Sequence, residues 1–417
     1  CSTCSLHSPD DSPSRQVAML RLLQAPPNPP SPPASADLTN LCATPPLSLG
    51  SPQPVALALW WEGAPPNGSA RGWSDGWRYF SAFRCGPRAR NVCLAYRERA
   101  QRARLVGGLE SADGANFSLR ARVRAGLVVP ASAWAMSENL AIVRDRGGYL
   151  LVGGRTPLVL AHASSWHYPE GTALAALPPA RRPPHWLVAR KVLNSTHPCI
   201  EGKWFEPVAA GRQSAPPVQS RCVYDGRLSI VRVRGRLFLY ARADIHYGRR
   251  HVQMTWSDDE GLSWAPFRLI RIEGAPPAHE CLALNIYFFA AQRNPVGNSS
   301  LIAIFPVAHR ARGCIAISVS RDGLHWSAVR PVVNCATDRS KERTIHQPVA
   351  GMILEGGSVY IYIHENVPNL THVQDMPRPR SRLVRYRVKS KRLARWSEMA
   401  LRSIIPEDQS TTSVERL

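Results

Sequence analysis

Apolar residues occur along the chain in short runs that are rich in β-branched and aromatic side chains and are separated by glycine turns. The clearest cases are 139–155, 227–242 and 349–365, each with two such runs around one turn. Segment 286–307 has the same pattern with a longer turn, and 54–135 contains further strand-like runs. These features are typical of β-hairpins, so the pattern predicts an all-β fold.

The hairpins recur at a nearly constant spacing. Asp225, Asn285 and His346 precede successive first strands and are 60 and 61 residues apart. Trp264 and Trp326, which end two similar turns, are 62 residues apart. Four-stranded units at a fixed period are typical of a β-propeller. A β-sandwich with accidental spacing is the alternative.

Two acidic turns share the order Ser-x-Asp-x-Gly-x-x-Trp, one of them shortened by a residue. They are 257–264, SDDEGLSW, and 320–326, SRDGLHW. The aspartate of such a turn can accept backbone N–H groups, and the glycine supplies a positive φ. The tryptophan can then fold over the open end of the hairpin. We therefore expect Asp259 and Asp322 to be structural.

These turns resemble the Asp box of sialidases and other glycosidase propellers. Residues 137–390 resemble the five-bladed propellers of glycoside hydrolases such as arabinanases and invertases, most clearly in YDGRLSIVRVRGRLFLYAR and the strand that follows. The resemblance implies a five-bladed propeller. It also implies carboxylates at the starts of the innermost strands, where two of them act on a glycosidic bond.

The resemblance indicates three catalytic candidates. Asp225 stands at the entry of an inner strand, Glu280 precedes the next inner strand where a general acid is expected, and Glu138 stands at the entry of the earliest clear unit. The family usually has an aspartate at the position of Glu138. The alternatives are a turn cap for Asp225 and a solvated loop position for Glu280.

Five further residues are predicted to bind substrate. Arg227, Arg242 and Arg249 are spaced to reach one rim, where guanidinium groups could hold the carboxylate or sulfate of an acidic sugar. His346 and Gln347 open a later unit and could bind sugar hydroxyls. Taken singly, each arginine could instead be an exposed strand or loop residue.

The composition divides the chain into two parts. Residues 1–53 are rich in Pro and Ser and are predicted to form a disordered stalk, whereas 54–410 should form the propeller. The formal net charge is +22, which favours an anionic partner, and we rank nucleic acid below an acidic carbohydrate because the basic residues are scattered. No apolar run is long enough for a transmembrane helix in this chain.

Cysteines and glycosylation sequons indicate the compartment. Ten cysteines and five Asn-x-Ser/Thr sequons favour an oxidising, glycosylating environment, so we predict a secreted, cell-surface or Golgi-lumen protein with disulfides and N-glycans. Asn298, at a hairpin reversal, is the best glycan candidate. Cys1 and Cys4 form a lone CxxC without the partners of a zinc site, and we predict neither a metal nor a cofactor.

The first functional hypothesis is a glycoside hydrolase or related carbohydrate-active enzyme of the secretory pathway. The second is a non-catalytic propeller that binds glycans or proteins, because propellers have many unrelated functions. A sialidase ranks lower, since its usual starting motif is missing and only four units are clear. An accessory domain of a glycosyltransferase would fit a Pro-rich stem, but the sequence has no nucleotide-binding motif.

Overall fold

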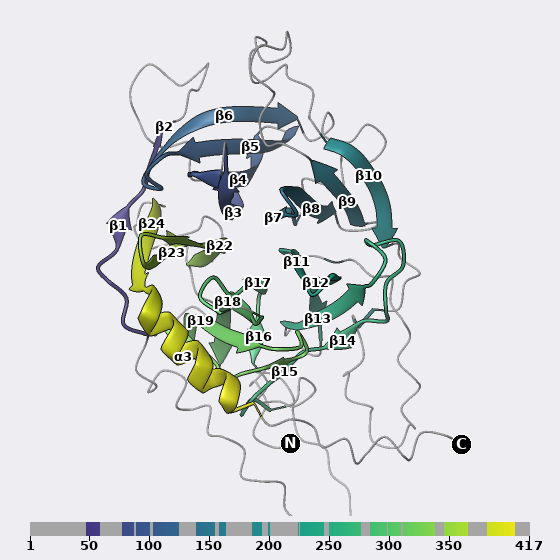
Figure 1. The fold of residues 1–417 in the computed structure, drawn as a ribbon, viewed down its shortest axis with the longest axis vertical. Coiled ribbons are helices and arrows are strands. Elements are labelled where there is room, and N and C mark those ends of the chain that lie inside the picture. Colours follow the sequence, from purple (N-terminus) through teal and green to yellow (C-terminus); the bar gives the residue numbers. More distant parts are fainter. Residues whose placement is uncertain are drawn as a thin grey trace, which may run out of the picture.

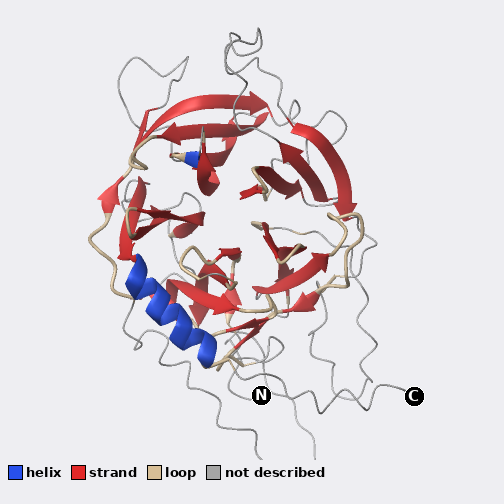
Figure 2. Ribbon diagram, viewed as in Figure 1, coloured by secondary structure: helices blue, strands red, loops and turns tan. Residues whose placement is uncertain are grey.

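The chain folds into antiparallel β-sheets arranged around a central axis, as seen in a computed structural model (Figure 1). Strands form almost all the regular structure described, together with the helix α3 (Ser390–Arg402) (Figure 2). The prediction of an all-β fold is confirmed. The structure describes residues 47–58, 77–86, 89–100, 103–124, 139–154, 158–163, 186–193, 199–200, 224, 226–245, 250–276, 284–297, 299–309, 312–337, 346–365 and 382–404.

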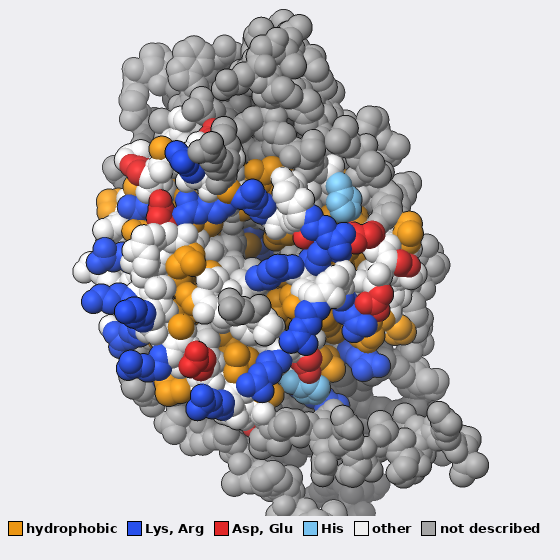
Figure 3. All heavy atoms as spheres, viewed as in Figure 1, with side chains coloured by type: hydrophobic (Ala, Val, Ile, Leu, Met, Phe, Trp, Pro, Cys, Tyr) orange, Lys and Arg blue, Asp and Glu red, His pale blue; other side chains and the backbone are white. Residues whose placement is uncertain are grey.

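The innermost strands form a closed ring. Each contacts the next in chain order, and the last contacts the first. The sheets extend outward from this ring as in a β-propeller (Figure 1), and the face seen in Figure 3 is hollowed near its centre. The five strands are β3 (Trp77–Cys85), β7 (Ala141–Asp145), β11 (Ser229–Val233), β17 (Ala290–Arg293) and β22 (Gln347–Glu355).

Each inner strand starts an antiparallel group of strands. Outward from β3 lie β4 (Asn91–Ala100), β5 (Ala103–Ser111) and β6 (Asn116–Arg124), with β2 (Ala56–Ala58) parallel to β6 at the edge. Outward from β7 lie β8 (Gly148–Gly154), β9 (Leu158–Ala163) and β10 (Trp186–Leu193). Outward from β11 lie β12 (Arg236–Asp244), β13 (Arg250–Ser257) and β14 (Arg268–Leu269).

The remaining two groups are less regular. β17 and the short β16 (Asn285–Ile286) both pair with β18 (Leu301–His309), which is followed by β19 (Arg312–Ser320). β19 pairs with β20 (His325–Trp326) and β21 (Arg330–Thr337), and β15 (Arg271–Ile272) lies outside β20. Outward from β22 lie β23 (Ser358–Glu365), β24 (Arg382–Lys389) and β1 (Gln53–Pro54).

Contacts between neighbouring inner strands explain the spacing of about 60 residues seen in the sequence. The hydroxyl of Ser229 on β11 lies 2.9 Å from both the backbone N and O of Ala291 on β17, 62 residues away. The backbone N–H of Met352 on β22 donates to the side chain of Gln292, 60 residues away. Positions one period apart are therefore neighbours across successive inner strands.

The ring closes where the first and last groups meet. β22 pairs in parallel with β3 through Ala350 and Ser81. Next to this bridge Gly351 has φ +102°, and a Cβ atom there would lie 1.9 Å from the carbonyl oxygen of Ala82. Any side chain at this position would separate the two strands, so only glycine permits this approach.

An N-terminal segment completes the last group. Gln53 and Pro54 of β1 pair with β24, and the backbone N–H of Leu47 donates to the carbonyl of Pro331. Leu47 is buried at 5% exposure against the core beneath α3. Residues 47–53, which the sequence assigns to the stalk, thus contact the folded ring.

The two predicted acidic turns have the expected hydrogen bonds. Asp259 accepts the N–H of Ser263, and Asp322 accepts the N–H groups of Leu324 and His325. In both turns the indole N–H of the tryptophan, Trp264 or Trp326, donates to the carbonyl of the turn glycine. Both aspartates have a lowered pKa, Asp259 to about 2 through its bonds to Ser263, and Asp322 through hydrogen bonds that outweigh its burial.

A third turn of this kind was missed in the sequence. In 111–117, SADGANF, Asp113 accepts the N–H groups of Ala115 and Asn116 and the hydroxyl of Ser111. Its final aromatic residue is Phe117, buried at 1% exposure, where the other two turns have tryptophan. A sequence pattern that ends in tryptophan therefore does not include this turn.

Two of these turns accept a hydrogen bond from a tyrosine of the group that precedes them around the ring. Tyr240 of β12 donates its hydroxyl to the carbonyl of Gly323, and Tyr362 of β23 donates to that of Gly114. Both phenols are buried, and burial raises the pKa of Tyr362 to about 12. Both side chains are therefore part of the buried core.

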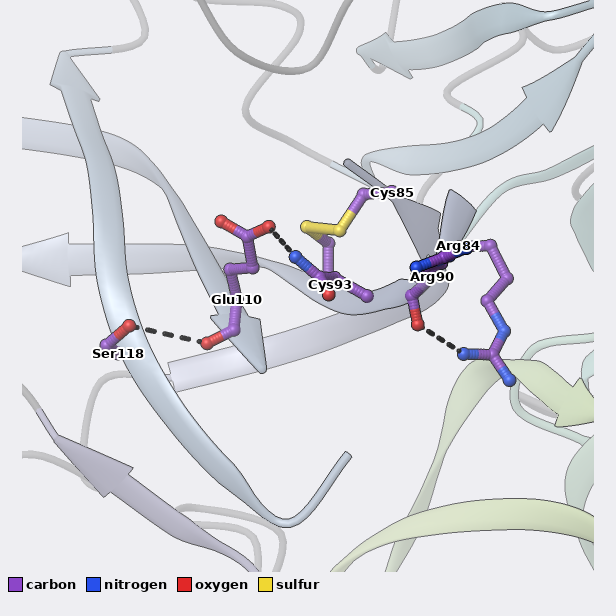
Figure 4. The surroundings of a disulfide bond; sticks show 7 residues. Arg84, Cys85, Arg90, Cys93, Glu110 and Ser118 are labelled. Carbon is purple, nitrogen blue, oxygen red and sulfur yellow. Dashed lines mark hydrogen bonds between the residues drawn. A yellow bond between two sulfur atoms is a disulfide. The ribbon is translucent and has the colours of Figure 1, made fainter. Parts of the chain in front are cut away.

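A disulfide joins the first two strands of the first group. Cys85 of β3 and Cys93 of β4 are bonded, and the carboxylate of Glu110 on β5 lies beside them and accepts the side-chain N–H of Asn91 (Figure 4). Cys199 is also disulfide-bonded, with a partner outside the described residues. Cys314 is a buried free thiol, so the even cysteine count does not mean that every cysteine is paired.

The closure of the ring gives a first prediction. We expect Gly351→Ala to lower the free energy of unfolding by about 3 kcal/mol or more, because the backbone of Ala82 cannot move away without breaking the β22–β3 bridge. Gly357→Ala is the matched control, since Gly357 also has a positive φ but has nothing within 4 Å of the added Cβ. Urea unfolding should give a loss of about 1 kcal/mol for the control. Equal losses in the two variants would contradict the steric explanation.

Candidate functional site

The candidate site lies at the end of the ring where the inner strands begin, which we call the entry face. The second strand of each group runs back to this end and the third strand leaves it, so the end of β12 and the start of β13 are also here. The acidic turns follow the third strands and lie at the opposite end, the turn face. Asp259 and Asp322 are thus separated from the entry face by the length of a strand.

Arg227 lies in the centre of the ring. The residue comes just before β11 in the chain, and it is 1% exposed. Its Nη2 group donates a hydrogen bond of 2.7 Å to the hydroxyl of Ser81 on β3. Its guanidinium also lies 5.7 Å from the ring centre of Phe288, just before β17. Arg227 therefore joins three groups of strands, and the alternative of an exposed strand residue is wrong.

Two further arginines lie around one aromatic ring. The guanidinium carbons of Arg242 and Arg250 lie 5.8 and 5.3 Å from the ring centre of Tyr287. Asp244 interacts with both, at 2.9 Å from Nη2 of Arg242 and 3.8 Å from Nε of Arg250. We call Arg242, Asp244, Arg250 and Tyr287 the arginine cluster. Such a group offers planar N–H donors and an aromatic face to a ligand.

The backbone before β11 is held against this cluster. Gly226 has φ +101°, and a Cβ there would lie 3.3 Å from Cδ of Arg242. Tyr224 is fully buried, and its carbonyl accepts the side-chain N–H of Asn139, which precedes β7. The carbonyl of Asn139 in turn accepts the N–H of Leu228. The starts of β7 and β11 are therefore directly connected.

The start of β22 supplies a second set of polar side chains. Gln347 is 4% exposed, and its Oε1 has no hydrogen-bond partner in the described part of the chain. It pairs across the hairpin with His364, whose ring packs edge-on against Phe80 at 5.4 Å. His346 is partly buried beside it.

Burial controls the protonation of the two histidines. It lowers the pKa of His364 to about 4, with a further lowering from His346. It also lowers the pKa of His346, and the nearby carboxylate of Glu365 only partly opposes this effect. The carboxylate of Glu365 accepts a hydrogen bond of 2.6 Å from Nε of Arg382. Both imidazoles are therefore neutral near pH 7 and can donate to or accept from a hydroxyl group.

Four of the predicted site residues lie outside the described residues: Asp225, Glu280, Glu138 and Arg249. The other four, Arg227, Arg242, His346 and Gln347, are all at the entry face or just inside it. Sequence reasoning missed Arg250 and Tyr287. The stacking of Arg250 on an aromatic ring of the next group has no local sequence signal, because Tyr287 lies 37 positions further along the chain.

One group of possible metal ligands occurs in the described residues, Cys85, Cys93 and Glu110. Both sulfurs are in the disulfide, so they are not available as thiolate ligands. No helix in the described ranges is long and apolar enough to cross a membrane.

Comparisons with known proteins gave similarities of structure. No protein family matches the sequence, and no curated protein matches it. One similar structure is the catalytic domain of a GH62 α-L-arabinofuranosidase from Coprinopsis cinerea, with 9% identity and a TM-score of 0.47, covering 82% of this chain and 98% of that chain. Another is Zg3597, a family 117 glycoside hydrolase from Zobellia galactanivorans, with 12% identity and a TM-score of 0.43, covering 82% and 90%.

A third similar structure is the β-1,2-mannobiose phosphorylase from Listeria innocua in complex with β-1,2-mannobiose. It is 11% identical, with a TM-score of 0.42, and covers 78% of this chain and 94% of that chain. These names describe the neighbours.

The buried histidine gives a second prediction. The folded chain holds His364 at a pKa of about 4, below the ordinary 6.5, so the unfolded chain binds more protons between these values. The free energy of unfolding should therefore fall as the pH is lowered through this window. We expect His364→Gln to reduce that fall by on the order of 1–3 kcal/mol, measured by urea unfolding at about pH 7 and pH 4.5. The same pH dependence in both proteins would show that His364 is not its source.

Proposed function

We propose that the chain is a five-bladed β-propeller that acts on a glycan at its entry face, as a glycoside hydrolase or related carbohydrate-active enzyme. Each of the five antiparallel groups would be one blade, which the closed ring of inner strands supports. The substrate would carry an anionic group. The observation that carries the proposal is the arginine cluster, with its two guanidiniums around one aromatic ring at the entry face.

This cluster has the chemistry that an acidic sugar requires. Guanidinium groups bind a carboxylate or sulfate through paired N–H donors. The ring of Tyr287 lies beside them, where the apolar face of a sugar could pack. Gln347 and the neutral histidines of the neighbouring blade would bind hydroxyls, since the Oε1 of Gln347 is a buried acceptor that the described residues leave unsatisfied.

In this proposal the catalytic groups are Asp225 and Glu280, with Glu138 as a further carboxylate. The hydrogen bond between Asn139 and Tyr224 supports it, because the chain neighbours of Glu138 and Asp225 are in direct contact. Asp225 would be ionised, as nucleophile, base or stabiliser of the oxocarbenium-like state. Glu280 would be the protonated acid.

The proposed compartment is the secretory pathway, leading to the Golgi lumen, the cell surface or secretion. The disulfide between Cys85 and Cys93 and the bonded Cys199 support an oxidising environment. Of the five sequons, Asn116 is described and exposed, and its side-chain N–H donates to Asp113 in the third acidic turn. Asn298 lies outside the described residues.

The second candidate is a propeller that binds glycans without cleaving them. It is favoured by the glutamate at position 138, where the related hydrolases usually have an aspartate. A sialidase remains third, because it would need six blades where the described chain has a ring of five inner strands.

The catalytic proposal is tested with conservative variants of the carboxylates. Screening against a glycan panel should identify a hydrolysed substrate, and Glu280→Gln should lower its rate by ~10²–10⁴ because the transferable proton is lost. Asp225→Asn should be at least as damaging, with unfolding curves unchanged for both. Glu398→Gln, which removes an exposed carboxylate of α3, is the control. Full activity in both site variants would refute the catalytic roles, and binding without cleavage would favour the second candidate.

The role of the arginine cluster is tested separately. Arg242→Gln should weaken binding of the acidic glycan about tenfold or more, because a charge-assisted hydrogen bond to the ligand is lost. Binding of the same glycan without its acidic group should change little. Arg321→Gln on the turn face is the control, since Arg321 is exposed and makes no ion pair in the described structure. Equal effects on the acidic and neutral glycans would show that the cluster does not recognise the anion.

A further inference from the structure

A second positively charged surface lies at the outer edge of the ring, away from the entry-face site. It is formed by β24 and α3, and Figure 3 shows Lys and Arg side chains gathered along the edge that these elements occupy. We call it the basic strip. Its six residues, all exposed, are Arg387, Lys389, Lys391, Arg392, Arg395 and Arg402.

The packing of α3 fixes the direction in which this strip points. Leu393 and Trp396 are buried against the core shared by β19, β23 and β24. The basic residues of the helix lie on its opposite side, as expected for an amphipathic surface helix. The 13 residues of α3 span about 20 Å, so the charges form a line on a rigid support.

The strip differs from those arginines of the turn face that pair with carboxylates in the described structure. On the turn face Arg232 binds Asp145 and Glu260, and Arg236 binds Asp258. No residue of the strip makes an ion pair in the described structure, and Glu398 is the one acidic residue of α3. Among the described residues the strip therefore has an excess of positive charge, which an anionic partner would neutralise.

The start of α3 reinforces this charge. The helix has no acidic residue in its first turn, and Lys389 at the N-cap makes no capping hydrogen bond. Lys391 and Arg392 stand where the helix dipole is positive, an arrangement that lowers helix stability. A bound anion would offset both effects, because it would interact with the positive end of the helix dipole and with the two side chains.

We propose that the basic strip binds a linear polyanionic polysaccharide through its sulfate or carboxylate groups. A line of guanidinium and ammonium groups on a rigid helix is complementary to a chain with anionic groups at intervals, and arginine binds such groups with paired donors. A membrane surface fits less well, because Met399 is the one large apolar side chain exposed on α3. Nucleic acid is disfavoured by the disulfide between Cys85 and Cys93.

The test uses a variant that removes the charge without weakening the helix. Lys391→Glu combined with Arg392→Glu places acidic groups at the positive end of the dipole, so thermal stability should stay the same or rise. Affinity for a sulfated oligosaccharide of at least ~20 Å should fall tenfold or more at ~0.1 M salt. Adding Arg395→Glu should weaken binding further. The same measurement with a polysaccharide that carries carboxylates but no sulfates shows which of these two anionic groups the strip binds.

The control has the same change in net charge at a different place. Arg234→Glu combined with Arg321→Glu alters two exposed arginines of the turn face, and its affinity should stay within threefold of the unaltered protein. Equal losses in both variants would mean that only the overall charge matters and would overturn the proposal. Strip-dependent binding to vesicles of anionic lipid, without binding to the polysaccharide, would also overturn it. Any glycan cleavage at the entry face should be unchanged in the strip variants.

Discussion

The approach of β22 to β3 is the constraint on which the rest of the structure depends. Strands of successive groups contact one another around the axis, but the ring closes only if the last group reaches the first. It does so through Ala350 and Ser81, beside a glycine whose Cβ would overlap the carbonyl oxygen of Ala82. Without this contact the ring would stay open between the first and last groups, and the start of β22 would not be held against β3.

The two ends of the ring have different chemistry because of the direction of the strands. At the turn face, carboxylates are used by turn backbones and by arginines such as Arg232, so this end is structurally satisfied. At the entry face, Gln347 and Arg250 come from the starts of strands in different groups, and the buried Oε1 of Gln347 has no hydrogen-bond partner among the described residues. The direction of the strands thus places the stabilising turn contacts at one end of the ring and the residues proposed to bind the ligand at the other.

Much of the fold could be predicted from sequence, because hairpins and acidic turns have local signals. The glycine turns and the runs at 139–155, 227–242 and 349–365 correspond to hairpins of the structure. The turn at Asp113 was missed because its aromatic residue is Phe117. The position of Arg227 could not be predicted, since burial at the centre depends on Ser81, a partner 146 residues away. The carboxylates inferred from family resemblance are outside the described residues.

The pairing of β1 with β24 has a consequence for biosynthesis. Gln53 binds Arg385 across 332 positions of the chain, so the last group cannot be completed until almost the whole domain has been synthesised. Pairing over such a separation is slow, because the entropy of closing a long loop is lost before the contacts form. During translation the edge of β23 would stay open, and an open edge can pair with another chain. The last group can therefore be completed only after β24 has emerged from the ribosome.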